Sequence, residues 1–208
     1  MMELIVAEDL AAEGVVLFLE VGPRTVSLAG GSTPRLLYER LAGTPYPWDD
    51  VDVFFGDERC VPADDPDSDF KMADDALLSK IPARVHPMVG CDPDGYEREL
   101  RGVFGDDPPR FDLMLLGVGT DGHTASLFPG DPALDVTDRW VVLVEHPDHR
   151  RMTLTLPVLS ASKVVVFLVA GPEKREVLAK MLAGADIPAA RVRAERTVIL
   201  ADRAAVGA

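Results

Sequence analysis

The segment Leu115–Gly130 reads LLGVGTDGHTASLFPG and joins a buried strand to a glycine-rich turn. Its first residues end the apolar run Phe111–Gly117, which is typical of a strand covered on both faces of a parallel sheet. Glycines in the turn let the backbone bend sharply and approach a ligand closely. The turn carries Asp121 and His123, and an imidazole titrates near neutral pH. This combination predicts an active site at the end of the strand.

Strand-like apolar segments alternate with amphipathic segments along most of the chain. The expected strands are Thr25–Ala29, Val51–Phe55, Val85–Val89, Phe111–Gly117, Trp140–Val144, Met152–Leu156, Lys163–Ala170 and Thr197–Ala201. The expected helices cover Glu8–Val21, a segment that begins at Ser32-Thr33-Pro34, residues 72–81, Tyr96–Phe104 and residues 177–182. The alternation predicts a Rossmann-like, doubly wound α/β fold, with a mostly parallel sheet and helices on both faces. No repeat or linker interrupts the 208 residues, so we expect a single domain over residues 1–208.

The composition excludes several classes of partner. The net charge is −14, from 21 Lys and Arg against 35 Asp and Glu. Nucleic acids and anionic membranes bind basic surfaces, so neither is an expected partner, and any anionic ligand needs a local cluster of cations. The longest apolar runs, such as Val164–Ala170, are too short to cross a bilayer.

The cysteines and the N-terminal segment indicate the compartment. Cys60 and Cys91 have neither metal-ligand spacing nor the pattern of a disulfide framework, so we expect two reduced thiols. The segment MMELIVAEDLAAEG lacks the basic and long apolar regions of a signal peptide. We therefore expect a cytoplasmic protein that is a monomer or a small homo-oligomer.

Four of the expected strands are each followed by a polar or glycine-rich signature. In an open parallel sheet, ligands bind outside the carboxyl ends of the strands, which lie at one edge. The signatures are distant in sequence, yet this rule brings them together. They are GGSTP after Ala29, GDER after Phe55, GVGTDGH after Leu116 and GPEK after Ala170.

The GGSTP signature is a candidate phosphate site. Gly30 and Gly31 precede Ser32 and Thr33 at an expected helix start, where free backbone N–H groups and the helix dipole attract anions. The alternative is that one of the two hydroxyls caps the helix and binds no ligand. The segment is neither a Walker loop nor a dinucleotide fingerprint.

Three cations are candidates for the same site. Arg59 and Lys174 lie in strand-end signatures, and Arg151 opens the expected strand RMTLTL. Arginine binds phosphate through two parallel N–H bonds, and lysine contributes a mobile charge. Each of the three is otherwise an ordinary solvated surface charge, and Arg150 is an alternative to Arg151.

His123 is the candidate acid–base group, with Asp121 placed to orient it. Asp57 and Glu58 are either further acid–base groups or ion-pair partners of Arg59. The remaining histidines are interpreted as structural, and the scattered histidines and carboxylates predict no metal site. No serine or cysteine lies in a nucleophile elbow, so attack by water is favoured over a covalent intermediate.

Taken in order, these motifs resemble the 6-phosphogluconolactonase family. GGSTP alone also occurs in glucosamine-6-phosphate deaminases, whose fold is related, whereas the long central motif is highly specific. The motifs that carry the resemblance are GGSTP, DER-x-VP, GVGTDGHTASLFPG, R-x-TLTLPVLSAS and AGPEK.

The resemblance implies hydrolysis of 6-phospho-D-glucono-1,5-lactone to 6-phosphogluconate in the oxidative pentose phosphate pathway, without a metal or organic cofactor. It implies the fold of the deaminase and ribose-5-phosphate isomerase group. His123 would be the base that activates water, and Arg59 would stabilise the oxyanion or hold the substrate. Asp57 and Asp121 would orient these groups. The implied phosphate site contains Gly30, Gly31, Ser32, Thr33, Arg151 and Lys174.

One departure and two rival functions accompany the resemblance. The chain has Asp69 where the family often has Asn or Thr, which puts a substrate contact at that position in question. One rival is a glucosamine-6-phosphate deaminase, but its motif resembles GHIAFNEP, whereas this chain reads GHTASLFPG. The other is a non-catalytic sugar-phosphate sensor, which the absence of a helix-turn-helix segment before Gly30 and the acidic charge disfavour.

Overall fold

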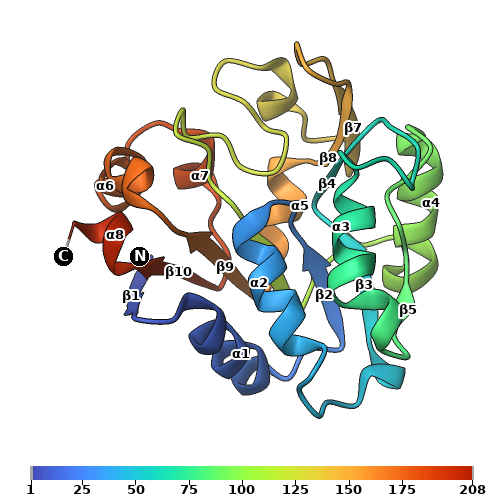
Figure 1. Cartoon of the computed structure of the whole chain (residues 1–208). Coiled ribbons are helices and arrows are strands. Elements are labelled where there is room, and N and C mark those ends of the chain that lie inside the picture. Colours follow the sequence, from blue (N-terminus) through green and yellow to red (C-terminus); the bar gives the residue numbers. More distant parts are fainter. Residues whose placement is uncertain (1, 208) are drawn as a thin grey trace.

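The computed structural model describes residues 2–207, within which the strands form two sheets (Figure 1). The larger sheet has seven strands in the order β1-β10-β9-β6-β2-β3-β5, and its pairings are parallel. Its strands are β1 (Glu3–Ala7), β2 (Thr25–Leu28), β3 (Asp52–Phe55), β5 (Arg84–Val85), β6 (Leu113–Leu116), β9 (Val164–Val169) and β10 (Arg196–Asp202). The helices are α1 (Leu10–Val21), α2 (Ser32–Leu41), α3 (Asp69–Ala76), α4 (Pro93–Phe104), α5 (Leu156–Ala161), α6 (Arg175–Leu182), α7 (Pro188–Arg191) and α8 (Arg203–Val206).

Helices cover both faces of the large sheet, as the sequence predicts. Successive residues of a strand point to opposite faces. On β3, the ring of Phe54 packs against Phe104 of α4 at 5.6 Å between centroids, whereas Phe55 packs against Phe70 of α3 at 5.9 Å. Helices α3 and α4 therefore lie on opposite faces. Helices α1, α2 and α3 pack side by side, in front of the sheet in Figure 1.

The strand order reverses between β2 and β6, near the centre of the sheet. Strands β3 and β5 extend the sheet on one side of β2, and β6, β9 and β10 extend it on the other. Ligand sites of doubly wound sheets lie at such a reversal, outside the carboxyl ends of the strands. The neighbouring strands β9, β6, β2 and β3 are the four that the polar signatures follow. The topology therefore brings the signatures together.

Two buried tyrosines hold the ends of β2 and β3. The Tyr38 hydroxyl of α2 donates to the Ala29 carbonyl at 2.8 Å and accepts from the Ala29 N–H at 2.9 Å. The Tyr96 hydroxyl of α4 makes the same pair of bonds to Phe55, at 3.3 and 2.9 Å. Each hydroxyl satisfies backbone groups where the strand ends, because buried N–H and C=O groups need partners. The two helices thereby fix the strand ends that precede GGSTP and GDER.

A second, antiparallel sheet contains β4 (Asp57–Arg59), β8 (Arg151–Leu154) and β7 (Val141–Val144), in that order. The sequence does not predict β4, since a three-residue strand of charged side chains lacks the apolar pattern of a strand. The expected strand Met152–Leu156 ends at Leu154, because Pro157 lies in the first turn of helix α5. The expected helix over residues 72–81 is divided in two: α3 covers Asp69–Ala76, and a separate 3₁₀ turn, Leu78–Lys80, follows it.

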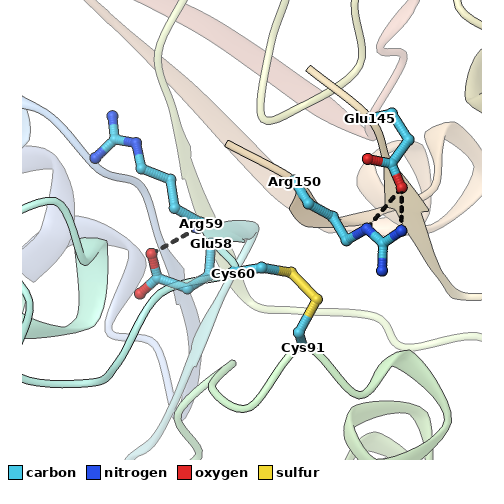
Figure 2. Close-up of a disulfide and its surroundings, with 6 residues drawn as sticks. All are labelled: Glu58, Arg59, Cys60, Cys91, Glu145 and Arg150. Carbon is cyan, nitrogen blue, oxygen red and sulfur yellow. Dashed lines mark hydrogen bonds and ion pairs between the residues drawn. A yellow bond between two sulfur atoms is a disulfide. The ribbon is translucent and has the colours of Figure 1, made fainter. Parts of the chain in front are cut away.

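The prediction of two reduced thiols is wrong. Cys60, directly after β4, forms a disulfide with Cys91 in the loop that precedes α4 (Figure 2). Their Cα atoms lie 5.0 Å apart, a separation that suits a disulfide. The cysteines are 31 residues apart in sequence, and only the folded chain brings β4 beside this loop. Within residues 2–207, no helix combines the length and the apolar character that a membrane crossing requires.

Replacing both cysteines with serine should destabilise the protein by about 3–4 kcal/mol, because a loop of this length gains conformational freedom in the unfolded state. Urea unfolding of the variant and of the oxidised wild type measures the difference. A reductant should destabilise the wild type and leave the double variant unchanged. Two titratable thiols in the native, unreduced protein would contradict the disulfide.

Candidate active site

A cleft of about 340 Å³ lies at the carboxyl edge of the central strands and collects all four polar signatures. The sequence-predicted site residues line it, except for Asp121, which reaches it through His123. Asp69 is an additional charged residue in the lining. The residues that line the cleft are Ala29, Gly30, Gly31, Ser32, Thr33, Pro34, Asp57, Arg59, Asp69, Gly117, Val118, Gly119, His123, Ala125, Arg151, Leu168, Ala170, Glu173 and Lys174.

His123 and Asp121 form a hydrogen-bonded pair in the turn after β6. The distance between His123 Nδ1 and Asp121 Oδ1 is 2.7 Å, and the same oxygen accepts the His123 backbone N–H at 3.1 Å. Burial opposes ionisation of Asp121, but these hydrogen bonds and the charge of His123 hold its pKa below the usual value. The carboxylate favours the tautomer with the proton on Nδ1, so Nε2 is left as a proton acceptor.

The glycines of this turn have separate structural roles. A Cβ atom on Gly119 would lie 2.1 Å from Nδ1 of His123, so the imidazole rests directly on the glycine backbone. Gly122 has φ +96°, a conformation that favours glycine, and its N–H donates to the Gly119 carbonyl at 2.9 Å. Gly117 has open space where a Cβ would project. The close approach at Gly119 therefore fixes the plane of His123.

The GGSTP segment begins α2 without a side-chain cap. Gly31 is the N-cap residue at φ +108°, and no side chain of the described residues caps the helix there. Among residues 2–207, the hydroxyls of Ser32 and Thr33 have no hydrogen-bond partner, and both residues face the cleft. The capping alternative is thus wrong for this helix. Its N–H groups and two hydroxyls remain available to an anion.

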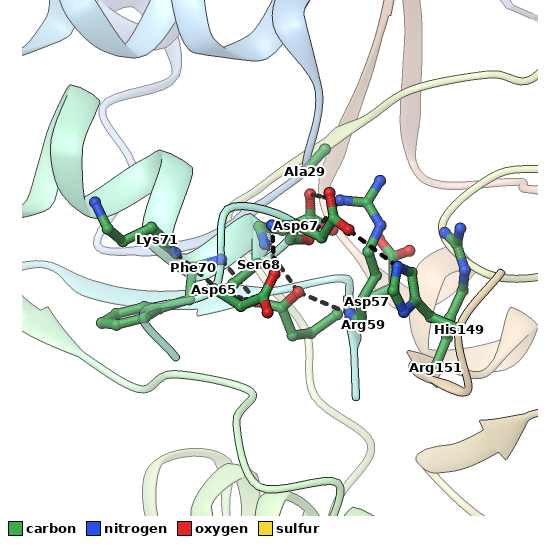
Figure 3. Close-up of polar contacts among 12 residues, drawn as sticks. Ala29, Asp57, Arg59, Asp65, Asp67, Ser68, Phe70, Lys71, His149 and Arg151 are labelled. Carbon is green, nitrogen blue, oxygen red and sulfur yellow. Dashed lines mark hydrogen bonds and ion pairs between the residues drawn. The ribbon is translucent and has the colours of Figure 1, made fainter. Parts of the chain in front are cut away.

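Arg59 and Arg151 are paired across the small sheet, directly opposite each other on β4 and β8. Like charges in this position repel, and nearby carboxylates offset the repulsion. Arg59 Nη1 lies 3.3 Å from Asp69 Oδ1, and Arg151 Nη2 donates to Asp148 at 2.6 Å. Figure 3 shows Arg59 beside the acidic segment that contains Asp67.

The structure also places Lys174 and decides between Arg150 and Arg151. Lys174, at the end of the short helical turn after β9, donates from Nζ to the Val118 carbonyl at 2.8 Å. This bond places its ammonium group beside the His123 turn. Arg150 instead pairs with Glu145 outside the cleft lining (Figure 2). Arg151, not Arg150, is therefore the cleft residue.

Asp57 and Glu58 are both buried but differ in their surroundings. Asp57 lines the cleft and accepts the Ser126 hydroxyl at 2.7 Å. Glu58 accepts the Ser68 hydroxyl and the backbone N–H groups of residues 59, 69 and 70, so it organises the start of α3. Burial raises the pKa of both carboxyls above their usual values. Among the described residues neither makes an ion pair with Arg59, so that alternative is wrong.

Of the three remaining histidines, His146 and His149 lie close to the site and His86 does not. His86 is structural, since it stacks on Phe54 and contacts Asp52 and Glu99. His146, in contrast, stacks on Phe128, and the Phe128 ring also lies 4.7 Å from the His123 ring between centroids. His149 lies 3.1 Å from Asp67, in the segment that contacts Arg59 (Figure 3). No group of three or more His, Cys, Asp or Glu within residues 2–207 is arranged to hold a metal ion.

Sequence reasoning missed three residues that shape the site. Ser126 lies inside the central motif, but nothing in the sequence pairs it with Asp57, 69 residues away. Asp148 adjoins the predicted strand of Arg151 and is visible only as part of a charged turn. Tyr38 is one of several apolar positions of α2. Each depends on a contact between separate elements.

The fold and the cleft define a Rossmann-like α/β protein that places a histidine–aspartate pair among three cations at the edge of a parallel sheet. A family model described as glucosamine-6-phosphate isomerases/6-phosphogluconolactonase matches residues 4–200. The chain belongs to this family.

Relatives and solved structures agree with this assignment. The 6-phosphogluconolactonase of Synechocystis sp. is 44% identical over 176 residues, which cover 79% of this chain and 73% of that protein. The Mycobacterium tuberculosis protein of the same name is 39% identical, and the match covers 93% of this chain and 85% of that protein. The Thermotoga maritima 6-phosphogluconolactonase structure matches with a TM-score of 0.85 at 33% identity, covering 97% of this chain and 100% of that one. A monomeric glucosamine-6-phosphate deaminase, with a TM-score of 0.80 at 21% identity over 99% of both chains, shares the fold.

Substituting Gly119 with alanine should displace the His123 ring and break its contact with Asp121, because the new Cβ would overlap the imidazole. Gly117→Ala is the matched control, since its Cβ enters open space. Long-range ¹H–¹⁵N spectra of the histidine rings report the tautomer and the hydrogen bond of His123. An unchanged His123 signal in Gly119→Ala would show that the ring does not rest on this glycine.

Proposed function

We propose that this protein hydrolyses 6-phospho-D-glucono-1,5-lactone to 6-phospho-D-gluconate. The observation that carries the proposal is the cleft itself, in which His123 shares one cavity with Arg59, Arg151, Lys174 and the open start of α2. A phosphorylated lactone needs a base beside its neutral ester group and cations beside its charged phosphate. The names of the relatives in Synechocystis sp., Mycobacterium tuberculosis and Thermotoga maritima support the same reaction.

The phosphate of the substrate is proposed to bind at the cationic end of the cleft. Gly30, Gly31, Ser32 and Thr33 offer N–H and hydroxyl donors that have no partner within residues 2–207, at the positive end of the α2 dipole. Arg59, Arg151 and Lys174 add charge-assisted hydrogen bonds. An anion between Arg59 and Arg151 also relieves the repulsion of this cross-strand pair.

The reaction is proposed to begin with proton transfer from water to Nε2 of His123, while the water oxygen attacks the lactone carbonyl carbon. The bond from this carbon to the ring oxygen then breaks, and the proton passes from His123 to that oxygen, which becomes a hydroxyl. Asp121 holds the imidazole and stabilises its transient charge. Asp57, held by Ser126, helps to orient the cations, which in turn stabilise the developing oxyanion.

This reaction requires modest catalysis and no metal or organic cofactor. Lactones are activated esters, so general base catalysis of about 10²–10⁴-fold, combined with electrostatic stabilisation, accounts for a useful rate. In the cell we place the reaction in the oxidative branch of the pentose phosphate pathway, in the cytoplasm.

His123→Ala should lower the rate of lactone hydrolysis by about 10²–10⁴-fold while the protein stays folded, because the variant lacks the proton acceptor. Loss of freshly prepared 6-phosphogluconolactone, corrected for spontaneous hydrolysis, measures the rate. His149→Ala is the control, since this ring contacts Asp67 outside the cleft lining. Wild-type turnover in His123→Ala would remove His123 as the base, and ammonia release from glucosamine-6-phosphate would favour the deaminase rival.

Lys174→Met should raise KM for the phosphorylated lactone by about 10- to 100-fold, with a much smaller change in kcat, because a charge-assisted hydrogen bond to the phosphate is lost. Initial rates over a range of substrate concentrations separate the two constants. Lys163→Met is the matched control, because Lys163 pairs with Asp112 at the amino end of β9. An unchanged KM in Lys174→Met would exclude Lys174 from the phosphate site.

A further inference from the structure

Asp69 lies inside the cleft at the first residue of α3. Its side chain is 6% exposed, and Ser68 before it caps the helix. A Cβ atom on Gly30 would fall 1.8 Å from Asp69 Oδ1, so the carboxyl group lies against the backbone of the GGSTP turn. The same oxygen is 3.3 Å from Arg59 Nη1. Asp69 therefore stands between the two features that are proposed to bind phosphate.

The Asp69 carboxylate is the least stabilised of the three buried acids near the cleft. Glu58 accepts four hydrogen bonds, and Asp57 accepts a short one from Ser126. Among residues 2–207, the Asp69 carboxylate accepts only the long bond from Arg59. Hydrogen bonds to a carboxylate favour its charged form, so their scarcity favours protonation. The ionisable groups that face Asp69 are Asp57, Glu58 and Arg59 of β4, Arg151 of β8 and Tyr38 of α2.

When its acids are ionised, the charged side chains that line the cleft balance one another. Three cations, Arg59, Arg151 and Lys174, line it together with three carboxylates, which are Asp57, Asp69 and Glu173. A phosphate ester carries close to two negative charges above pH 7. Its arrival beside an ionised Asp69 would place like charges together in a poorly hydrated site, where their repulsion is strong.

We propose, on the basis of the function above, that Asp69 takes up one proton from solvent when the cleft binds a phosphorylated ligand and then donates a hydrogen bond to the phosphate. Protonation frees Arg59 from its ion pair with Asp69, so the guanidinium turns its charge to the ligand. Arg59 keeps its position through the bond from Nη1 to the Asp67 carbonyl, at 2.6 Å. Asp69 is thereby a specificity-determining residue that makes phosphate affinity depend on pH.

The electrostatics of the site agree with this role. Burial, followed by the charges of Asp57 and Glu58, raises the pKa of Asp69 to about 8, against the opposing charges of Arg59 and Arg151. A bound phosphate raises this pKa further. Between the two values the complex holds one proton more than the free protein, so affinity falls as pH rises, by up to about tenfold per pH unit.

Isothermal titration with 6-phosphogluconate from pH 7.5 to 9.5 tests the inference, because the phosphate of this ligand keeps a constant charge over that range. Titrations in two buffers of different ionisation enthalpy give the number of protons taken up. For the wild type we expect the number of protons taken up per bound ligand to rise towards one as the pH is raised to 9, while the affinity for 6-phosphogluconate falls. This measurement needs no variant.

Asp69→Asn should bind 6-phosphogluconate without proton uptake and with affinity independent of pH, about tenfold or more tighter than the wild type at pH 9. Asparagine retains the backbone bond to Glu58 and an oxygen for Arg59, and circular dichroism verifies the fold. Asp67→Asn is the matched control and should keep the wild-type pH dependence, since its side chain is outside the cleft lining.

Two results would overturn the inference: absence of proton uptake in the wild type, or equal uptake in Asp69→Asn. The rate of lactone hydrolysis, measured on the same samples, separates this failure from failure of the proposed function. Active enzyme without proton uptake refutes the role of Asp69 alone. A protein that neither binds 6-phosphogluconate nor hydrolyses the lactone refutes both proposals.

Discussion

The parallel register of the four central strands is the constraint on which the site depends. Leu28 of β2 pairs with Phe55 of β3, and Leu116 of β6 pairs with Phe167 of β9, so the strands end at nearly the same level. A slip of two residues would displace one signature by about 6–7 Å along the strand. Burial on both faces opposes such a slip, because each strand is nearly all apolar. The packing of the core therefore fixes the positions of the four signatures that line the cleft.

The carboxyl edge of the central strands brings like charges close together. Two arginines face each other across the small sheet, and buried carboxylates lie within reach of them. Asp148 accepts a hydrogen bond from Arg151 and offsets part of the repulsion between the two arginines, and the Ser126 hydroxyl donates to Asp57 and stabilises its charge. Buried groups with perturbed protonation concentrate at functional sites.

Much of this arrangement is predictable from the sequence, for identifiable reasons. Long apolar segments predict the buried strands. Because the carboxyl ends of parallel strands lie at one edge of the sheet, the sequence also predicts that GGSTP, GDER, GVGTDGH and GPEK lie together. Contacts between separate elements are not predictable in this way. The Cys60–Cys91 disulfide and the bond from Ser126 to Asp57 each join segments with no shared motif. The charged strand β4 exists only because β8 pairs with it.

The sequence by itself determined the parallel α/β class, the four strand-end signatures and the pairing of Asp121 with His123 in one turn. These features follow from hydrophobic periodicity and from residues close together in the chain. The tertiary structure alone decided that Arg151 rather than Arg150 enters the cleft, and that Asp69 lies against Gly30 beside Arg59. Strand pairing and helix packing set those distances, and no local pattern encodes them. The glycine-rich turn thus identifies the site, and its partners across the fold set its electrostatics.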